Sequence, residues 1–152
     1  MTKSVLAAVT SAFLLLGTAL AWAQAEGTAA EAKAMLEKAV AALKANKADA
    51  LAKFPKTDGG FRDRDLYVFC YNVSDGKFTA HPNDKLMATD IRALKEPGGS
   101  PLGQNIFDTA KPGAISTVDY KFPRPGTTEA VPKQSFVTVV GDQGCGVGYY
   151  KK

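Results

Sequence analysis

Apolar positions along the chain recur with a helical period near the N-terminus and with a strand period further on. Leu36, Val40 and Leu43 stand three and four residues apart in a segment rich in Ala, Lys, Glu and Leu, which predicts an amphipathic helix. The pattern Thr28-Ala29-Ala30-Glu31 is a capping box, typical of a helix start. We interpret the apolar stripe as a surface that docks on a sheet, and helix-to-helix dimerisation is the alternative.

The alternating part of the chain predicts an antiparallel sheet. Residues 66–71 are aromatic and β-branched, and their alternation places Tyr67, Phe69 and Tyr71 on one face. Further strands are predicted at residues 77–81, 115–122, 135–140 and 145–150, and shorter helical segments at residues 48–54, 90–95 and 102–110. The order of elements predicts an α+β fold, in which a long N-terminal helix packs on a five- to six-stranded antiparallel sheet.

Composition narrows the class of protein without giving a function. The 152 residues are 45% hydrophobic and 22% charged, which suits one soluble globular domain rather than a disordered tail or a polytopic membrane protein. A net charge of +4 is too small to indicate nucleic-acid binding. One histidine and two cysteines exclude a four-cysteine zinc site and any site that needs two imidazoles, so we expect neither a metal nor a cofactor.

The N-terminus has the layout of a secretory signal peptide. Lys3 precedes an apolar run over residues 5–21, and two small-x-small cleavage sites end at Ala23 and Ala25. We expect residues 1–25 to be the signal peptide and residues 26–152 to be the mature domain, with an uncleaved membrane anchor as the alternative. No later apolar stretch is long enough to cross a bilayer, so the expected location is the bacterial periplasm or the exterior.

Export also changes the interpretation of the two cysteines. In an oxidising compartment Cys70 and Cys145 are expected to form a disulfide, with two buried free thiols as the alternative. The bond would close a loop of 75 residues and contribute about 4 kcal/mol on the chain-entropy model.

Six short motifs in order carry a resemblance to a known family. They are Tyr67-Val68-Phe69-Cys70-Tyr71-Asn72, Asp75-Gly76, His81-Pro82, Tyr120-Lys121-Phe122-Pro123-Arg124-Pro125-Gly126, Lys133-Gln134-Ser135-Phe136-Val137 and Gly148-Tyr149-Tyr150. Together they resemble the single Cache domain, the PAS-like extracellular sensor module of bacterial chemoreceptors and sensor kinases, over residues 29–150. Asn72 and Phe136 depart from the residues common in the family, and the two cysteines are not part of its general pattern. With no transmembrane helix or output domain after the sheet, the chain looks like a free-standing Cache protein.

The resemblance implies a pocket on a PAS-like sheet that binds a small organic acid. Lys133 would supply the cation, the phenols of Tyr67 and Tyr120 and the ring of His81 would donate hydrogen bonds, and Phe69 and Tyr149 would form apolar walls. Each of these residues also has a purely structural interpretation. We therefore hypothesise a sensor-type binding protein for a small carboxylate metabolite, which presents its ligand state to a membrane sensor protein.

Two other classes of function compete with this hypothesis. A periplasmic interaction or dimerisation module with a vestigial pocket would dock a partner through the N-terminal helix or a sheet edge. An enzyme is not expected, because the sequence has no G-x-S-x-G elbow, no phosphate-binding loop and no haem motif. Among the remaining charges, Arg124 is predicted to lie on the surface, and residues 62–65 to form a self-neutralised loop.

Overall fold

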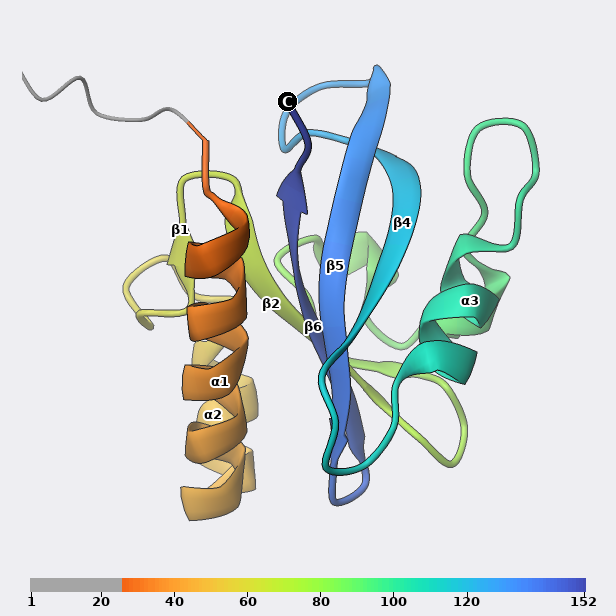
Figure 1. Cartoon of the computed structure of the whole chain (residues 1–152). Helices are drawn as coiled ribbons and strands as arrows, with labels where there is room; N and C mark the ends of the chain where they lie inside the picture. Colours follow the sequence, from red (N-terminus) through yellow and green to blue (C-terminus); the bar gives the residue numbers. More distant parts are fainter. Residues whose placement is uncertain (1–25) are drawn as a thin grey trace, which may run out of the picture.

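A computed structural model describes residues 26–152 as helices packed on a six-stranded antiparallel sheet (Figure 1). The helices are α1 (Ala29–Ala45), α2 (Lys47–Lys53) and α3 (Leu102–Thr109), with short 3-10 segments at Asp84–Leu86 and Ile91–Ala93. The strands are β1 (Arg62–Asp63), β2 (Leu66–Asn72), β3 (Phe78–Ala80), β4 (Ser116–Pro123), β5 (Ala130–Val140) and β6 (Gln143–Tyr150). The predicted α+β class is confirmed.

The sheet has the order β1-β2-β6-β5-β4, and β3 also pairs with β2. Helices α1 and α2 cover one face, and α3 with the two 3-10 segments lies toward the other (Figure 1). The predicted signal peptide, residues 1–25, lies outside the described residues. Between residues 26 and 152, no helix has the length and apolar content needed to span a membrane.

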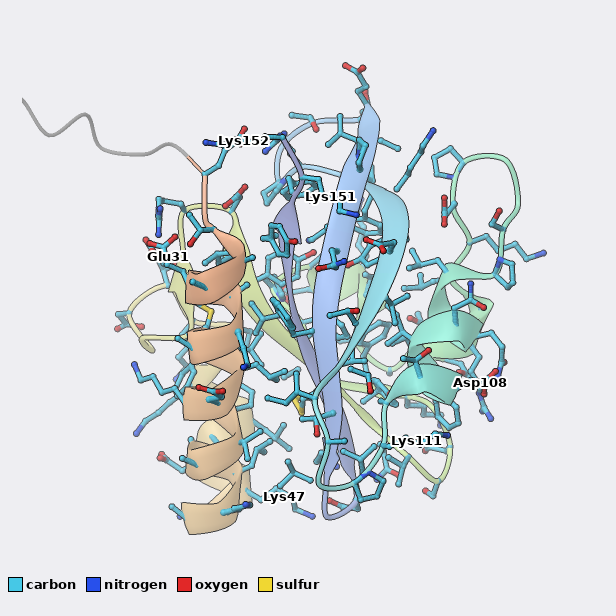
Figure 2. The ribbon with its side chains drawn as sticks, viewed as in Figure 1. Glu31, Lys47, Asp108, Lys111, Lys151 and Lys152 are labelled. Atoms are coloured by element: carbon cyan, nitrogen blue, oxygen red, sulfur yellow. A yellow bond between two sulfur atoms is a disulfide. The ribbon has the colours of Figure 1, made fainter. Side chains whose placement is uncertain are left out.

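Helix α1 begins at the predicted capping box and buries its apolar stripe against the sheet. The Glu31 N–H donates to Thr28 Oγ1 at 3.2 Å, and the Thr28 N–H donates to the Glu31 carboxylate at 2.8 Å. Leu36 and Leu43 are buried in the core, whereas Val40 is half-buried. The stripe therefore serves the docking that we predicted. Charged side chains such as Lys47 and Lys111 project outward (Figure 2).

Alternation along β2 divides the core into two layers. Leu66, Val68 and Cys70 pack under α1, and the aromatic side chains between them pack on the opposite face. Cys70 and Cys145 are directly opposed on β2 and β6 and form a disulfide, which confirms the predicted pairing. The bond lies wholly buried on the α1 face.

One strand differs from its predicted form. Strand β5 begins at Ala130, five residues before the predicted start at 135, because it pairs with β4 from Pro123 onward in spite of Pro132. Helix α3 keeps its predicted position, and Gly103 within it has a packing role. A Cβ at Gly103 would overlap the Ile91 carbonyl, so the glycine lets α3 approach the preceding 3-10 segment closely.

Candidate functional site

A small pocket lies between the aromatic face of the sheet and α3. This inner cavity has a volume of about 30 Å³. Its walls are mostly apolar and come from Phe69, Phe78, Ile91, Leu94, Leu102, Ile106 and Phe122. Its polar groups come from Tyr67, His81 and Tyr120, three of the residues that the sequence predicted for a pocket. Phe69, predicted as an apolar wall of a ligand site, lines this pocket.

A larger depression, the outer cleft, adjoins the inner cavity. It has a volume of about 620 Å³ and shares the side chains of Tyr67, His81 and Phe122 with the inner cavity. Its charged walls are Arg62, Arg64, Lys85, Arg124 and Asp84. The shared residues therefore form the boundary between an apolar interior and a cationic entrance.

Lys133 lies behind this boundary rather than in either space. It is 1% exposed, and its Nζ donates to Tyr67 Oη at 3.1 Å and to Tyr150 Oη at 3.4 Å. The same amine lies 4.4 and 4.5 Å from the ring centroids of Tyr67 and Tyr150, and 5.6 Å from that of Phe122. Within residues 26–152 no carboxylate oxygen comes within 4 Å of it. Lys133 is thus a buried amine held by ring faces and phenol oxygens.

Burial governs the ionisation of this amine. Loss of hydration lowers the pKa of Lys133 from 10.5 to about 7, although the charge of Asp65 acts in the opposite direction. An anion brought close to the amine would favour its charged form and raise its pKa again.

The two phenols at the inner cavity remain protonated hydrogen-bond donors. Tyr67 Oη accepts the Lys133 hydrogen bond, so its own O–H proton is directed elsewhere. Tyr120 Oη lies 2.6 Å from Ser135 Oγ, and either oxygen serves as the donor. Burial raises the pKa of both Tyr67 and Tyr120 well above the usual value near 10. A carboxylate that entered here would meet O–H donors rather than phenolates.

His81 presents a third donor at the end of β3. Its Nδ1 accepts the N–H of Asn83 at 2.9 Å, so the neutral ring carries its proton on Nε2. Burial, with the nearby Lys133 charge as the second cause, lowers the pKa of His81 from 6.5 to about 4. At neutral pH the ring is therefore an uncharged N–H donor, wedged edge-on between Tyr67 and Phe78 with ring centroids 5.3 Å away on each side.

Tyr149 is a correction to the predicted site. It lies on the α1 face of the sheet, stacks on Phe136 with centroids 6.1 Å apart and donates to Gln134 Oε1 at 2.9 Å. Because side chains alternate along β6, it is the next residue, Tyr150, that faces Lys133. Sequence reasoning missed Tyr150, although the pair of adjacent tyrosines signalled that one of them would face each way.

Arg124 lies at the surface of the outer cleft, but its side chain is partly buried rather than fully exposed. Its guanidinium lies over the ring of Tyr150, 4.5 Å from the centroid, and its side chain is 29% exposed. It pairs with Glu26 at 2.8 Å and with Asp65 at 3.4 Å. Arg64, placed in a self-neutralised loop by the sequence, does pair with Asp63, and it also reaches Glu31 at 2.6 Å.

Comparison with known proteins identifies relatives of this chain. The profile described as "Cache domain" matches residues 24–144. A methyl-accepting chemotaxis protein from Vibrio parahaemolyticus superposes with a TM-score of 0.65 at 22% identity, covering 80% of this chain and 86% of that one. A "periplasmic sensor domain of chemotaxis protein" gives a TM-score of 0.60 at 26% identity, covering 79% and 88%.

Two further proteins are similar to this chain. A Cache chemosensory domain described for carboxylic acid recognition has a TM-score of 0.58 at 21% identity, covering 79% of this chain and 86% of that one. The methyl-accepting chemotaxis protein McpP of Pseudomonas putida is 31% identical over 87 residues, which are 57% of this chain and 16% of the receptor. The match thus spans about a sixth of that receptor's length.

Proposed function

The chain belongs to the Cache domain family, and we propose that it is a sensor-type periplasmic protein that binds a small organic acid. Its relatives include chemotaxis proteins and a periplasmic sensor domain of one, and a further relative is described for carboxylic acid recognition. Residues of this chain support the proposal independently of those similarities.

The observation that carries the proposal is the buried amine of Lys133, which has no carboxylate partner among residues 26–152. A cation that is 1% exposed loses nearly all its hydration, which is costly unless an anion or several hydrogen bonds replace the water. Here two phenol oxygens and three ring faces offset part of that cost. A small anion at the neighbouring boundary would supply the missing opposite charge.

The hydrogen-bond donors support one position for that anion. Tyr67 and His81 line both spaces, and each has a proton that no described residue accepts. A carboxylate placed between them receives two hydrogen bonds and lies next to the Tyr67 phenol, which the Lys133 amine polarises. The carbon tail would then occupy the inner cavity, whose volume of about 30 Å³ suits only a few heavy atoms.

We propose binding without turnover. The polar groups assembled at the boundary are hydrogen-bond donors, and a His81 with a pKa of about 4 is a weak base at neutral pH. Incubation of the protein with a bound acid, followed by one-dimensional NMR of the acid, should return the acid unchanged. Any steady conversion of the acid by the protein, lost in His81→Asn, contradicts this part of the proposal.

Thermal unfolding with short acids tests the proposed ligand class. Acetate, propionate, lactate and pyruvate are the probes, and a bound acid at about a hundredfold its Kd adds about 2.7 kcal/mol to the free energy of unfolding. Lys133→Met and Tyr67→Phe should reduce this gain, whereas Tyr149→Phe, the same change on the opposite face, should not. No stabilisation by any of the four acids, or equal stabilisation in Lys133→Met, contradicts the proposal.

A further inference from the structure

One of the cations that line the outer cleft is already paired with a carboxylate of the chain. Glu26, just before α1, places its Oε1 2.8 Å from Arg124 Nη1, on the turn between β4 and β5. The two side chains are 31% and 29% exposed, and Arg124 lines the outer cleft. A carboxylate from the chain itself therefore pairs with this cleft-lining cation.

Arg124 keeps its position independently of Glu26. Its guanidinium lies on the ring of Tyr150 at 4.5 Å, and Asp65 Oδ2 approaches it at 3.4 Å. Asp65 is itself nearly buried and is fixed by the Gly27 N–H, which donates to its Oδ1 at 2.7 Å. A planar donor held on an aromatic ring is preorganised for bidentate contact with a carboxylate.

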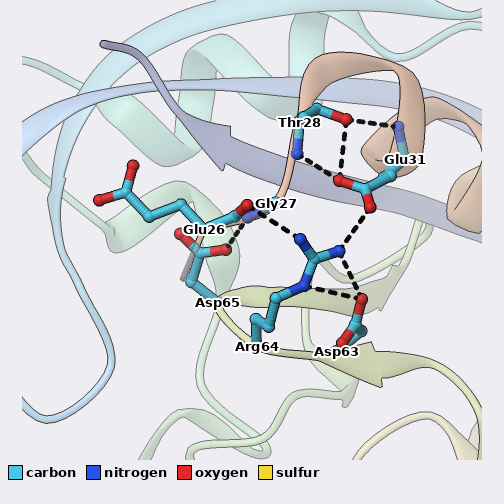
Figure 3. Close-up of polar contacts among 7 residues, drawn as sticks. All are labelled: Glu26, Gly27, Thr28, Glu31, Asp63, Arg64 and Asp65. Carbon is cyan, nitrogen blue, oxygen red and sulfur yellow. Dashed lines mark hydrogen bonds and ion pairs between the residues drawn. The ribbon is translucent and has the colours of Figure 1, made fainter. Parts of the chain in front are cut away.

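The Glu26 side chain is held much less firmly. Its backbone carbonyl accepts from Arg64 Nη1 at 2.9 Å, but among the described residues its carboxylate contacts only Arg124. In Figure 3 this carboxylate points away from the cluster formed by Arg64, Asp63 and Glu31. A partly exposed ion pair of this kind contributes about 0.2–1 kcal/mol, so another carboxylate can replace it at little cost.

We propose that Arg124 is a second carboxylate-binding site, in the outer cleft, and that Glu26 stands in for the ligand there. The site takes organic carboxylates too large for the inner cavity, since the outer cleft has about 620 Å³ against about 30 Å³. Arg62 and Lys85 favour an entering anion, because both line the cleft and neither has a carboxylate within 4 Å in residues 26–152. A bound carboxylate displaces Glu26, and the segment that leads into α1 loses its ion pair with Arg124.

Sodium benzoate is a suitable probe, because its ring exceeds the inner cavity. The measurement is the NMR signal of the Arg124 Nε–Hε group, assigned by its loss in Arg124→Gln, during titration against sodium chloride of equal ionic strength. We expect a saturable shift of this signal. Glu26→Gln removes the competing carboxylate and should tighten benzoate binding by up to about fivefold, the equivalent of about 1 kcal/mol. Glu129→Gln, an exposed residue just before β5, is the matched control and should change nothing.

Two outcomes overturn the proposal. One is an Arg124 signal that responds to benzoate no more than to chloride, and the other is an unchanged affinity in Glu26→Gln. Failure of the acid site at the inner cavity is distinguishable from these outcomes. In Lys133→Met the benzoate response at Arg124 should persist even if short acids no longer bind, because the two sites use different cations.

Discussion

The amine of Lys133 and the phenol of Tyr67 meet at 3.1 Å although their strands are not neighbours. Lys133 is on β5 and Tyr67 is on β2, and β6 runs between them. The lysine side chain crosses β6 at Gly148, where a Cβ atom would lie 2.5 Å from Lys133 Cε and 2.5 Å from Ser135 Oγ. The site therefore depends on a position in the central strand that has no side chain.

Gly148→Ala should disable the site by filling that crossing point. The added methyl group forces the Lys133 stem or the Ser135–Tyr120 pair to move, which we expect to cost about 1–3 kcal/mol of stability and most of the affinity for a short acid. Urea unfolding and calorimetric titration with acetate measure the two effects. Gly113→Ala adds the same methyl in open space at φ +75, so it should lower stability without altering affinity. Full acetate affinity in Gly148→Ala contradicts this prediction.

Lys133→Met should change how stability depends on pH. The pKa of Lys133 is about 7 in the folded chain and near 10.5 when unfolded, so between these values the unfolded state holds the extra proton. The free energy of unfolding therefore rises with pH in this window, by at most about 1.4 kcal/mol per pH unit. Urea unfolding at pH 7 and pH 9 should show this rise, and Lys133→Met should lack it. Lys121→Met, at an exposed lysine on β4, is the control and should keep the rise.

Much of the fold follows from the sequence because periodicity reports which side of an element is buried. The spacing of Leu36 and Leu43 predicted the docked face of α1, and alternation predicted that Tyr67 and Phe69 would share a face. Both are local properties of one element. Tyr67, His81 and Tyr120 line one pocket, and family motifs rather than periodicity led us to predict that they lie together.

The errors arose where the answer depends on pairing between strands. Alternation shows that Tyr149 and Tyr150 face opposite ways, but only the register that opposes Tyr150 to Lys133 decides which one faces the site. The burial of Lys133 could not be predicted from the sequence either, because long charged side chains are almost always exposed. The partial burial of Arg124 was not predicted either, because the aromatic ring that covers it comes from another strand.

His81→Asn should reduce the loss of stability in acid. The pKa of His81 is about 4 in the folded chain against 6.5 in the unfolded one, so the unfolded state binds the extra proton between these values. Stability that is present above pH 6.5 is therefore lost as the pH falls toward 4, by at most about 3 kcal/mol. Asparagine keeps an acceptor for the Asn83 N–H and does not titrate. Urea unfolding at pH 7 and pH 4.5 measures both proteins, and an equal loss in the two contradicts the prediction.

Removal of the disulfide should lower stability without affecting acid binding. Replacing both Cys70 and Cys145 with alanine opens the closed loop of 75 residues, and we expect a loss of about 2–5 kcal/mol in the free energy of unfolding. The bond lies on the α1 face and the acid site on the other, so acetate affinity at 25 °C should stay within about twofold. Urea unfolding measures the loss of stability, and calorimetric titration with acetate measures the affinity. A tenfold loss of affinity in the folded variant indicates that the two faces are coupled.

The affinity for a short acid should fall as the pH rises above 7. Short carboxylic acids are fully ionised there, so the titrating group is Lys133, whose pKa near 7 in the free chain must rise when a carboxylate lies close to it. Binding above pH 7 therefore takes up a proton, and the affinity falls by at most about tenfold per pH unit until the raised pKa is reached. Calorimetric titration with propionate at pH 6.5, 7.5 and 8.5, in buffers with different heats of ionisation, measures both the affinity and the proton uptake. Tyr149→Phe should reproduce the wild-type slope. A pH-independent affinity with no proton uptake would show that the buried amine does not sense the ligand's charge.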